Sequence, residues 1–142
     1  MVDENPDMFY FEVPGPFATK GSTLAFRDYH NGKIRTKTDS KHGKTFASAV
    51  QWAARQAGVP MIPKGRGVTL SVVYGFARPK GRERLRCDPC VRPDVDKLCR
   101  ALMDALTGIA YADDGQVVAL SVRKIYADQV LARVIVMAEP GV

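Results

Sequence analysis

The sequence lacks any long apolar run, and no stretch approaches the roughly 20 consecutive apolar residues that a helix needs to cross a bilayer. Its N-terminus, MVDENPDMF, is acidic, whereas a secretory signal peptide begins with basic residues followed by apolar ones. Internal repeats and low-complexity segments are also missing. These absences argue against membrane-spanning, secreted and repeat proteins, and we expect an intracellular protein.

Cysteine is scarce as well. The three cysteines, Cys87, Cys90 and Cys99, cannot form a complete set of disulfides, and a reducing cytosol disfavours disulfides in any case. The segment CDPC has the spacing of a redox or zinc motif, but it supplies only half of a zinc site, and His30 and His42 lie far upstream. We interpret the pair as two loop cysteines, with a zinc site as the alternative.

The 142 residues, 46% hydrophobic and 25% charged, have the composition of one globular domain spanning 1–142. Apolar spacings of three and four residues predict helices over residues 44–57 and from Pro93 and Asp94 to Gly108. Runs rich in β-branched and aromatic residues predict strands, and Asn31-Gly32 predicts a hairpin turn. These strands and hairpin are expected over residues 8–15, 23–36, 67–77, 117–127 and 129–138. The order predicts an α+β (mixed α/β) fold, with two main helices packed on a mostly antiparallel or mixed sheet.

The formal net charge of +6 is unevenly distributed. Residues 20–44 contain seven Lys or Arg and two Asp, and residues 64–86 contain seven Lys or Arg and one Glu. Residues 88–128 reverse the balance, with seven Asp and five Lys or Arg. Basic segments attract a polyanion, whereas clustered carboxylates repel it unless a cation lies between them.

Asp94 and Asp96 place two carboxylates between Pro93 and an amphipathic run. An aspartate before a helix is a favoured N-cap, because its side chain accepts a hydrogen bond from a backbone N–H, and this role accounts for one of the two. Two helical positions would point about 200° apart. An extended Asp94 would instead put both carboxylates on one side, and Pro93 suits a chain that is not yet helical.

A second acidic pair, Asp113 and Asp114, lies beyond the same helix in ADDGQ, a segment that by itself is most typical of a turn. Together the carboxylates flanking the helix match the oxygen ligands that Mg²⁺ requires. Such an ion would polarise a phosphoryl oxygen and help to form a hydroxide nucleophile. The helix is roughly 20 Å long, so we expect Asp114 to come back along the sheet to meet Asp94 and Asp96.

Arg100 follows Asp96 by four residues, so the two share a helix face, and a surface ion pair is the default interpretation. In a phosphoryl-transfer site the same cation would neutralise charge on the transferred group. Lys97 projects to a different side and is expected to contact solvent or phosphate. Asp104 lies on another side of the helix, and we place it outside the site.

The segment RPDVDKLCRALMDALTGIAYADDGQVVAL, residues 92–120, closely resembles the RusA family of Holliday junction resolvases. The family signature is Pro-Asp-x-Asp-Asn-Leu, then a Lys, then Asp-Ala-Leu, then Asp-Asp-x-Gln-Val, and the spacing agrees throughout. A weaker similarity lies at VPGPFATKGSTLAFR, residues 13–27. The resemblance implies a Mg²⁺-dependent, structure-selective endodeoxyribonuclease, encoded by a phage or prophage and acting in the bacterial cytoplasm.

The resemblance also implies roles for single residues. The carboxylates that would hold Mg²⁺, with Mn²⁺ as a substitute, are Asp94, Asp96, Asp114 and, in support, Asp113. The family's catalytic lysine falls at Arg100, which keeps the charge but does not release a proton at an accessible pH, so its role would be electrostatic. The family's asparagine falls at Lys97, which adds charge beside the site.

A homodimer that cuts two strands of a four-way DNA junction symmetrically is implied too, and a two-fold junction suits a two-fold enzyme. The basic segments would then contact DNA phosphates, following shape and backbone rather than base sequence. The expected phosphate contacts are Lys20, Arg27, Lys33, Arg35, Lys37, Arg78, Lys80, Arg82, Arg84, Arg86 and Lys97.

Two alternatives stay open. The departures at Lys97 and Arg100 are compatible with a non-catalytic protein that binds branched DNA on the same scaffold. A zinc protein built around Cys87 and Cys90 is the other alternative.

Overall fold

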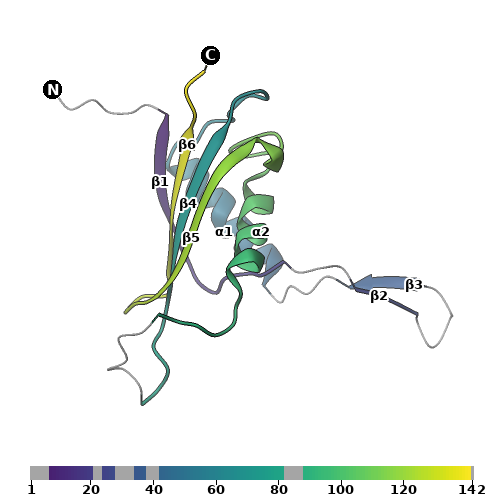
Figure 1. Ribbon diagram of the computed structural model, residues 1–142, viewed down its shortest axis with the longest axis vertical. Coiled ribbons are helices and arrows are strands. Elements are labelled where there is room, and N and C mark those ends of the chain that lie inside the picture. Colours follow the sequence, from purple (N-terminus) through teal and green to yellow (C-terminus); the bar gives the residue numbers. More distant parts are fainter. Residues whose placement is uncertain (1–6, 21–23, 28–33, 38–41, 82–87, 142) are drawn as a thin grey trace.

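A computed structural model describes residues 7–20, 24–27, 34–37, 42–81 and 88–141, with the backbone alone for the second and third of these ranges. Four strands form one sheet, two helices cover one of its faces, and a separate two-stranded hairpin stands apart from both (Figure 1). The predicted α+β fold is confirmed. The described residues include no helix with both the length and the apolar character to span a bilayer.

The sheet is mixed, with its strands in the order β1-β6-β4-β5. The strands are β1 (Met8–Pro14), β4 (Val68–Phe76), β5 (Val117–Tyr126) and β6 (Leu131–Ala138). β6 pairs antiparallel with both β1 and β4, whereas β4 and β5 are parallel. A parallel pair needs a crossover connection, and the second helix provides it.

The central strand β4 shows why one face of the sheet carries the core. Val68, Leu70 and Val72 are buried, and Thr69 and Ser71, which point to the other face, are half-buried. Successive side chains on a strand alternate between faces, so the apolar set lies under the helices. The buried hydroxyl of Tyr74 donates a hydrogen bond to the carbonyl oxygen of Leu98 (3.2 Å), which ties this strand to the second helix.

Both predicted helices are confirmed. Helix α1 (Gly43–Gln56) and helix α2 (Val95–Leu106) each turn an apolar stripe toward the sheet. The buried residues of α2 are Leu98, Cys99, Ala101, Leu102, Ala105 and Leu106. Gly58 and Gly108 follow the two helices with φ of 75° and 85°, a backbone conformation that favours glycine and ends a helix.

The predicted hairpin is also confirmed. Strands β2 (Leu24–Arg27) and β3 (Ile34–Lys37) pair antiparallel as a two-stranded sheet of their own. The expected turn at Asn31-Gly32 lies outside the described residues.

Candidate functional site

Asp94 occupies the N-cap position of α2 with φ −75° and ψ 143°, which is an extended conformation. Within the described part of the chain its side chain makes no capping hydrogen bond, although the helix begins normally, with the N–H of Leu98 donating to the Asp94 carbonyl oxygen (3.1 Å). Asp96 lies in the first turn, and both aspartates are exposed. The extended alternative therefore holds, and the Asp94 carboxylate is not engaged as a cap.

Lys124 of β5 fixes the loop that leads into Asp94. Its Nζ donates hydrogen bonds to the carbonyl oxygens of Val91 (2.6 Å) and Pro93 (2.9 Å). Lys124 and Asp94 line the same open groove, of about 640 Å³, together with Cys90, Val91, Arg92 and Val95. Sequence reasoning missed this lysine, because one lysine on a predicted strand gives no sign of what it bonds.

The outer face of α2 carries Arg100, one helical turn after Asp96. The default ion pair between them is not formed, and no described residue pairs with Arg100. Both side chains are exposed, and exposed pairs gain little from one fixed geometry. Burial, and secondarily the charge of Asp96, raise the pKa of the neighbouring Cys99 thiol.

Asp113 and Asp114 lie at a short 3₁₀ helix, η1 (Asp114–Gln116). Asp113 caps it, because its Oδ1 accepts a hydrogen bond from the Gly115 N–H (2.8 Å). That hydrogen bond, with smaller contributions from Asp114 and Lys64, lowers the pKa of Asp113. The cap leaves Asp114, which is exposed, as the member of the pair that is not needed to hold the turn.

Gln116 holds this acidic turn against the chain that precedes β4. Its Nε2 donates to the carbonyl oxygens of Ile62, Pro63 and Arg66 at 3.1 to 3.2 Å. Its Oε1 accepts from the backbone N–H groups of Ala112 (2.9 Å) and Asp113 (3.1 Å). Gln116 belongs to the Asp-Asp-x-Gln-Val part of the signature recognised in the sequence, but its three carbonyl partners could not be predicted from the sequence.

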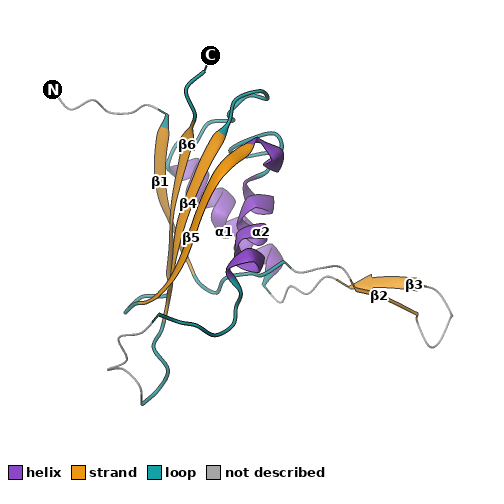
Figure 2. Cartoon of the chain, in the orientation of Figure 1, coloured by secondary structure: helices purple, strands orange, loops and turns teal. Residues whose placement is uncertain are grey.

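The two acidic pairs lie at opposite ends of α2 (Figure 2). Asp94 adjoins Lys124 near the end of β5, and Asp114 precedes Val117, the first residue of that strand. The seven residue steps from Val117 to Lys124 along β5 span about 23 Å. Among the described residues, no three carboxylate, histidine or cysteine side chains gather closely enough to hold a metal ion.

The expectation that Asp114 comes back to meet Asp94 and Asp96 within one subunit is therefore not met. The reason is the crossover connection, because α2 runs antiparallel to the two parallel strands that it joins. Its N-terminus lies where β4 ends, and the loop after it returns to where β5 begins.

The described basic residues are partly engaged already. Lys20 pairs with Asp104 of α2, and its N–H donates to the Lys97 carbonyl oxygen (3.0 Å). Arg78 lies 3.7 Å from Asp128, Lys80 is exposed, and Lys97 is half-buried. The remaining expected phosphate contacts lie where side chains are not described: Arg27, Lys33, Arg35, Lys37, Arg82, Arg84 and Arg86.

Cys87, half of the alternative zinc motif, also lies outside the described residues, whereas Cys90 is exposed.

Comparison with known proteins decides the family. The family model described as Endodeoxyribonuclease RusA matches residues 23–139. The chain belongs to the RusA family. It is also similar to the uncharacterized protein YqaN of Bacillus subtilis (strain 168), with 29% identity over 131 residues that cover 87% of this chain and 91% of that protein.

The predicted RusA resemblance is thus confirmed, and endodeoxyribonuclease is the activity of the family. The match includes both acidic pairs, both helices and the β2–β3 hairpin. It begins at residue 23, so most of the weaker similarity at residues 13–27 lies before it.

Proposed function

We propose that this RusA-family chain is a Mg²⁺-dependent endonuclease that hydrolyses phosphodiester bonds in branched DNA as a homodimer. The observation that carries the proposal is Asp94, an exposed aspartate at a helix N-cap whose carboxylate makes no capping hydrogen bond, with Asp96 two residues on. A free N-cap aspartate forgoes a contribution of about 1 kcal/mol to helix stability. Metal binding gives a reason for leaving it uncapped.

The donor set fits a hard divalent cation, because carboxylate oxygens are its preferred ligands. Asp94 and Asp96 would hold the ion from one end of α2, and Asp114 would complete the site from a partner subunit. Asp113 would support Asp114 through its cap on η1. Bound there, the cation supplies Lewis-acid polarisation of the phosphate and a hydroxide nucleophile.

A two-fold dimer joined along β5 would bring these residues together. β5 is an edge strand, with one long side unpaired in the described part of the chain. Exposed apolar side chains lie between the two acidic ends, namely Val95 (42%), Val118 (66%) and Leu120 (45%). Two antiparallel copies of β5 place the start of each strand beside the end of the other, so Asp114 of one subunit would approach Asp94 of its partner at two equivalent sites.

The remaining chemistry falls to basic side chains. Arg100 keeps its charge at every accessible pH, so it would stabilise charge on the phosphate without donating a proton. Its side chain has no ion-pair partner within the described ranges. Lys97, Lys80 and Arg78 would hold the DNA backbone, as would the basic residues of the hairpin and of the loop after β4.

A four-way DNA junction assay tests this function. We expect the chain to cut opposed strands when Mg²⁺ is present and to bind without cutting when it is absent. Asp94→Asn should reduce cleavage to background while junction affinity holds or rises, since one phosphate-repelling charge is removed. Asp104→Asn is the matched control, because that carboxylate pairs with Lys20 away from the proposed site, and it should cut normally. Binding with no Mg²⁺-dependent nicking in the unaltered chain would instead support the non-catalytic alternative.

A further inference from the structure

The sheet has a second face that no described helix covers, because α1 and α2 lie on the same side (Figure 2). Alternate residues of the strands make this face, and the strand register aligns them across the sheet. Glu12, Arg133, Val73 and Arg123 form one such row, and Pro14, Leu131, Gly75 and Ile125 form the next.

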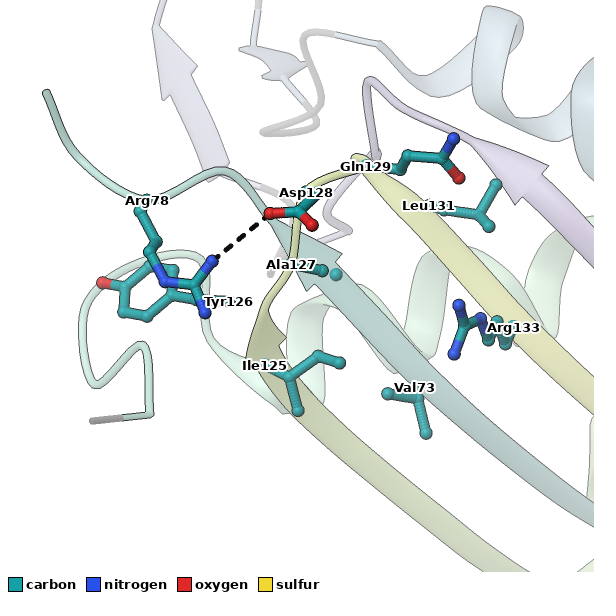
Figure 3. Close-up of a pocket in the computed structure, with 10 residues that line it drawn as sticks. Val73, Arg78, Ile125, Tyr126, Ala127, Asp128, Gln129, Leu131 and Arg133 are labelled. Carbon is teal, nitrogen blue, oxygen red and sulfur yellow. Dashed lines mark ion pairs between the residues drawn. The ribbon is translucent and has the colours of Figure 1, made fainter. Parts of the chain in front are cut away.

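A pocket of about 500 Å³ opens on this face where β4, β5 and β6 meet their loops. Val73, Ile125 and Leu131 give it an apolar floor, and Figure 3 shows Arg78 and Arg133 on opposite sides of it. Gly75 also lines it, and a Cβ there would lie 3.0 Å from the Gln129 carbonyl oxygen, a tight contact that a side chain could make only if its neighbours shifted slightly. The cavity is within the size range of small-molecule sites, and larger than a bare phosphate needs.

The charge of the pocket favours an anion. Arg133 has no ion-pair partner within the described ranges, although Glu12 is its cross-strand neighbour; the Glu12 carboxylate accepts a hydrogen bond from the Tyr10 hydroxyl (2.7 Å). Arg78 lies on the rim and pairs with the exposed Asp128 at 3.7 Å. Arg78 also opens the segment 78–86, which contains five Lys or Arg and one Glu. A guanidinium binds a phosphate oxygen pair well because its donors form a planar fork.

We propose that this pocket binds one nucleotide of a DNA strand, with its phosphate on Arg133 and its base over Val73, Ile125 and Leu131. An apolar floor with an arginine rim matches a ligand that has both a flat apolar body and an anionic group. DNA fits better than an acidic peptide, since the adjoining basic segment suits a regular polyanion. The inference rests on the proposed function only in taking DNA as the ligand.

The test uses the uncut complex, with Asp96→Asn in every protein so that no cleavage intervenes. Binding of a fluorescent oligothymidine is measured by anisotropy over a range of salt concentrations. Arg133→Gln should weaken binding about fivefold to tenfold and reduce the salt slope by about 0.7, the value for one phosphate on a single strand. Arg55→Gln is the matched control, because it removes one exposed arginine from α1, and it should change affinity less than twofold.

Methyl resonances of Ile125 and Leu131 provide a second readout that does not depend on net charge. They should shift when oligothymidine binds, and the shifts should be lost in Arg133→Gln. Equal losses of affinity in Arg133→Gln and Arg55→Gln, or displacement of the DNA by polyglutamate at matched charge, would overturn the inference. If the unaltered chain cuts junctions but Arg133→Gln binds oligothymidine normally, the pocket inference is wrong and the proposed nuclease stands. If the unaltered chain does not cut junctions but Arg133→Gln weakens binding as expected, the proposed nuclease is wrong and the pocket inference stands.

Discussion

Lys124 fixes the loop that carries Asp94 to strand β5 through two hydrogen bonds from one ammonium group. Lys124→Gln should lose at least one of these bonds and the charge beside Asp94. We expect junction cleavage at limiting Mg²⁺ to fall about tenfold, the usual effect of a residue that supports a metal ligand. Unfolding in urea should show a loss of about 1 kcal/mol.

The neighbouring Arg123→Gln is the matched control for that change. It removes the same charge from the same strand, but Arg123 points to the other face and pairs loosely with the exposed Asp88 (3.8 Å). Its stability should change by less than about 0.5 kcal/mol, and its Mg²⁺ requirement should be unchanged. If Lys124→Gln and Arg123→Gln both raised the Mg²⁺ requirement, Lys124 would act through its charge alone and would not position the loop.

Asp113 gives the acidic turn a pH dependence. The Gly115 N–H, then Asp114 and Lys64, lower the pKa of this carboxyl in the folded protein. A group whose pKa falls on folding contributes stability above its unfolded pKa, about 3.9 for aspartate, and loses that contribution as the pH drops through the folded value. The free energy of unfolding of the unaltered chain and of Asp113→Ala should therefore differ most above pH 4 and converge in stronger acid. If the difference in the free energy of unfolding between the two proteins stays constant down to pH 2, the Asp113 carboxylate does not stabilise the turn in the way proposed.

Strand β5 is the element on which the proposed dimer depends. Leu120→Lys places a charge in the middle of its exposed apolar edge, and we expect a folded monomer that no longer cuts junctions. Analytical ultracentrifugation gives the oligomeric state, and circular dichroism confirms the fold. Trp52→Lys is the control, because Trp52 is also an exposed apolar side chain (66%, against 45% for Leu120) but lies on α1. A dimer that survives Leu120→Lys would show that the subunits meet through another surface.

The helices could be predicted from the sequence because their signals are local. Leu98, Leu102 and Ala105 recur at helical spacing, and Gly108 stops the pattern. Strand order was beyond such reasoning. β5 and β6 are separated only by residues 127–130, yet β4 lies between them, because that arrangement is set by pairing between residues far apart in the chain.

The candidate site likewise has some features that local sequence predicts and others that depend on residues far apart in the chain. Asp94, Asp96 and Asp114 were proposed as site residues from motif and charge, and the extended backbone of Asp94 was one of two alternatives that the sequence left open. The separation of the acidic pairs could not be predicted, because it depends on which end of the sheet each loop reaches. Lys124 was missed for a related reason: its partners are backbone carbonyls, which leave no mark in a sequence.

In the molecule as a whole, the fold keeps the two acidic pairs apart. Helix α2 is packed on the sheet along its buried face, and Gln116 and Lys124 secure the loops at its two ends. Closing about 20 Å within one subunit would require α2 to leave the core. In the proposed dimer a second subunit would supply the third carboxylate without any such movement, so each proposed metal site would depend on both chains.

Mixed dimers test that dependence directly. Asp96→Asn and Asp114→Asn homodimers should both be inactive, because each loses a ligand at both sites. A heterodimer of the two, co-expressed with different affinity tags and purified through both, has both changes at one site and none at the other. If sites are shared between subunits, it should nick one strand of a four-way junction at up to half the rate of the unaltered dimer, without the paired second cut. If each site were built within one chain, every site in the heterodimer would carry a change, and no nicking above that of the homodimers would be seen.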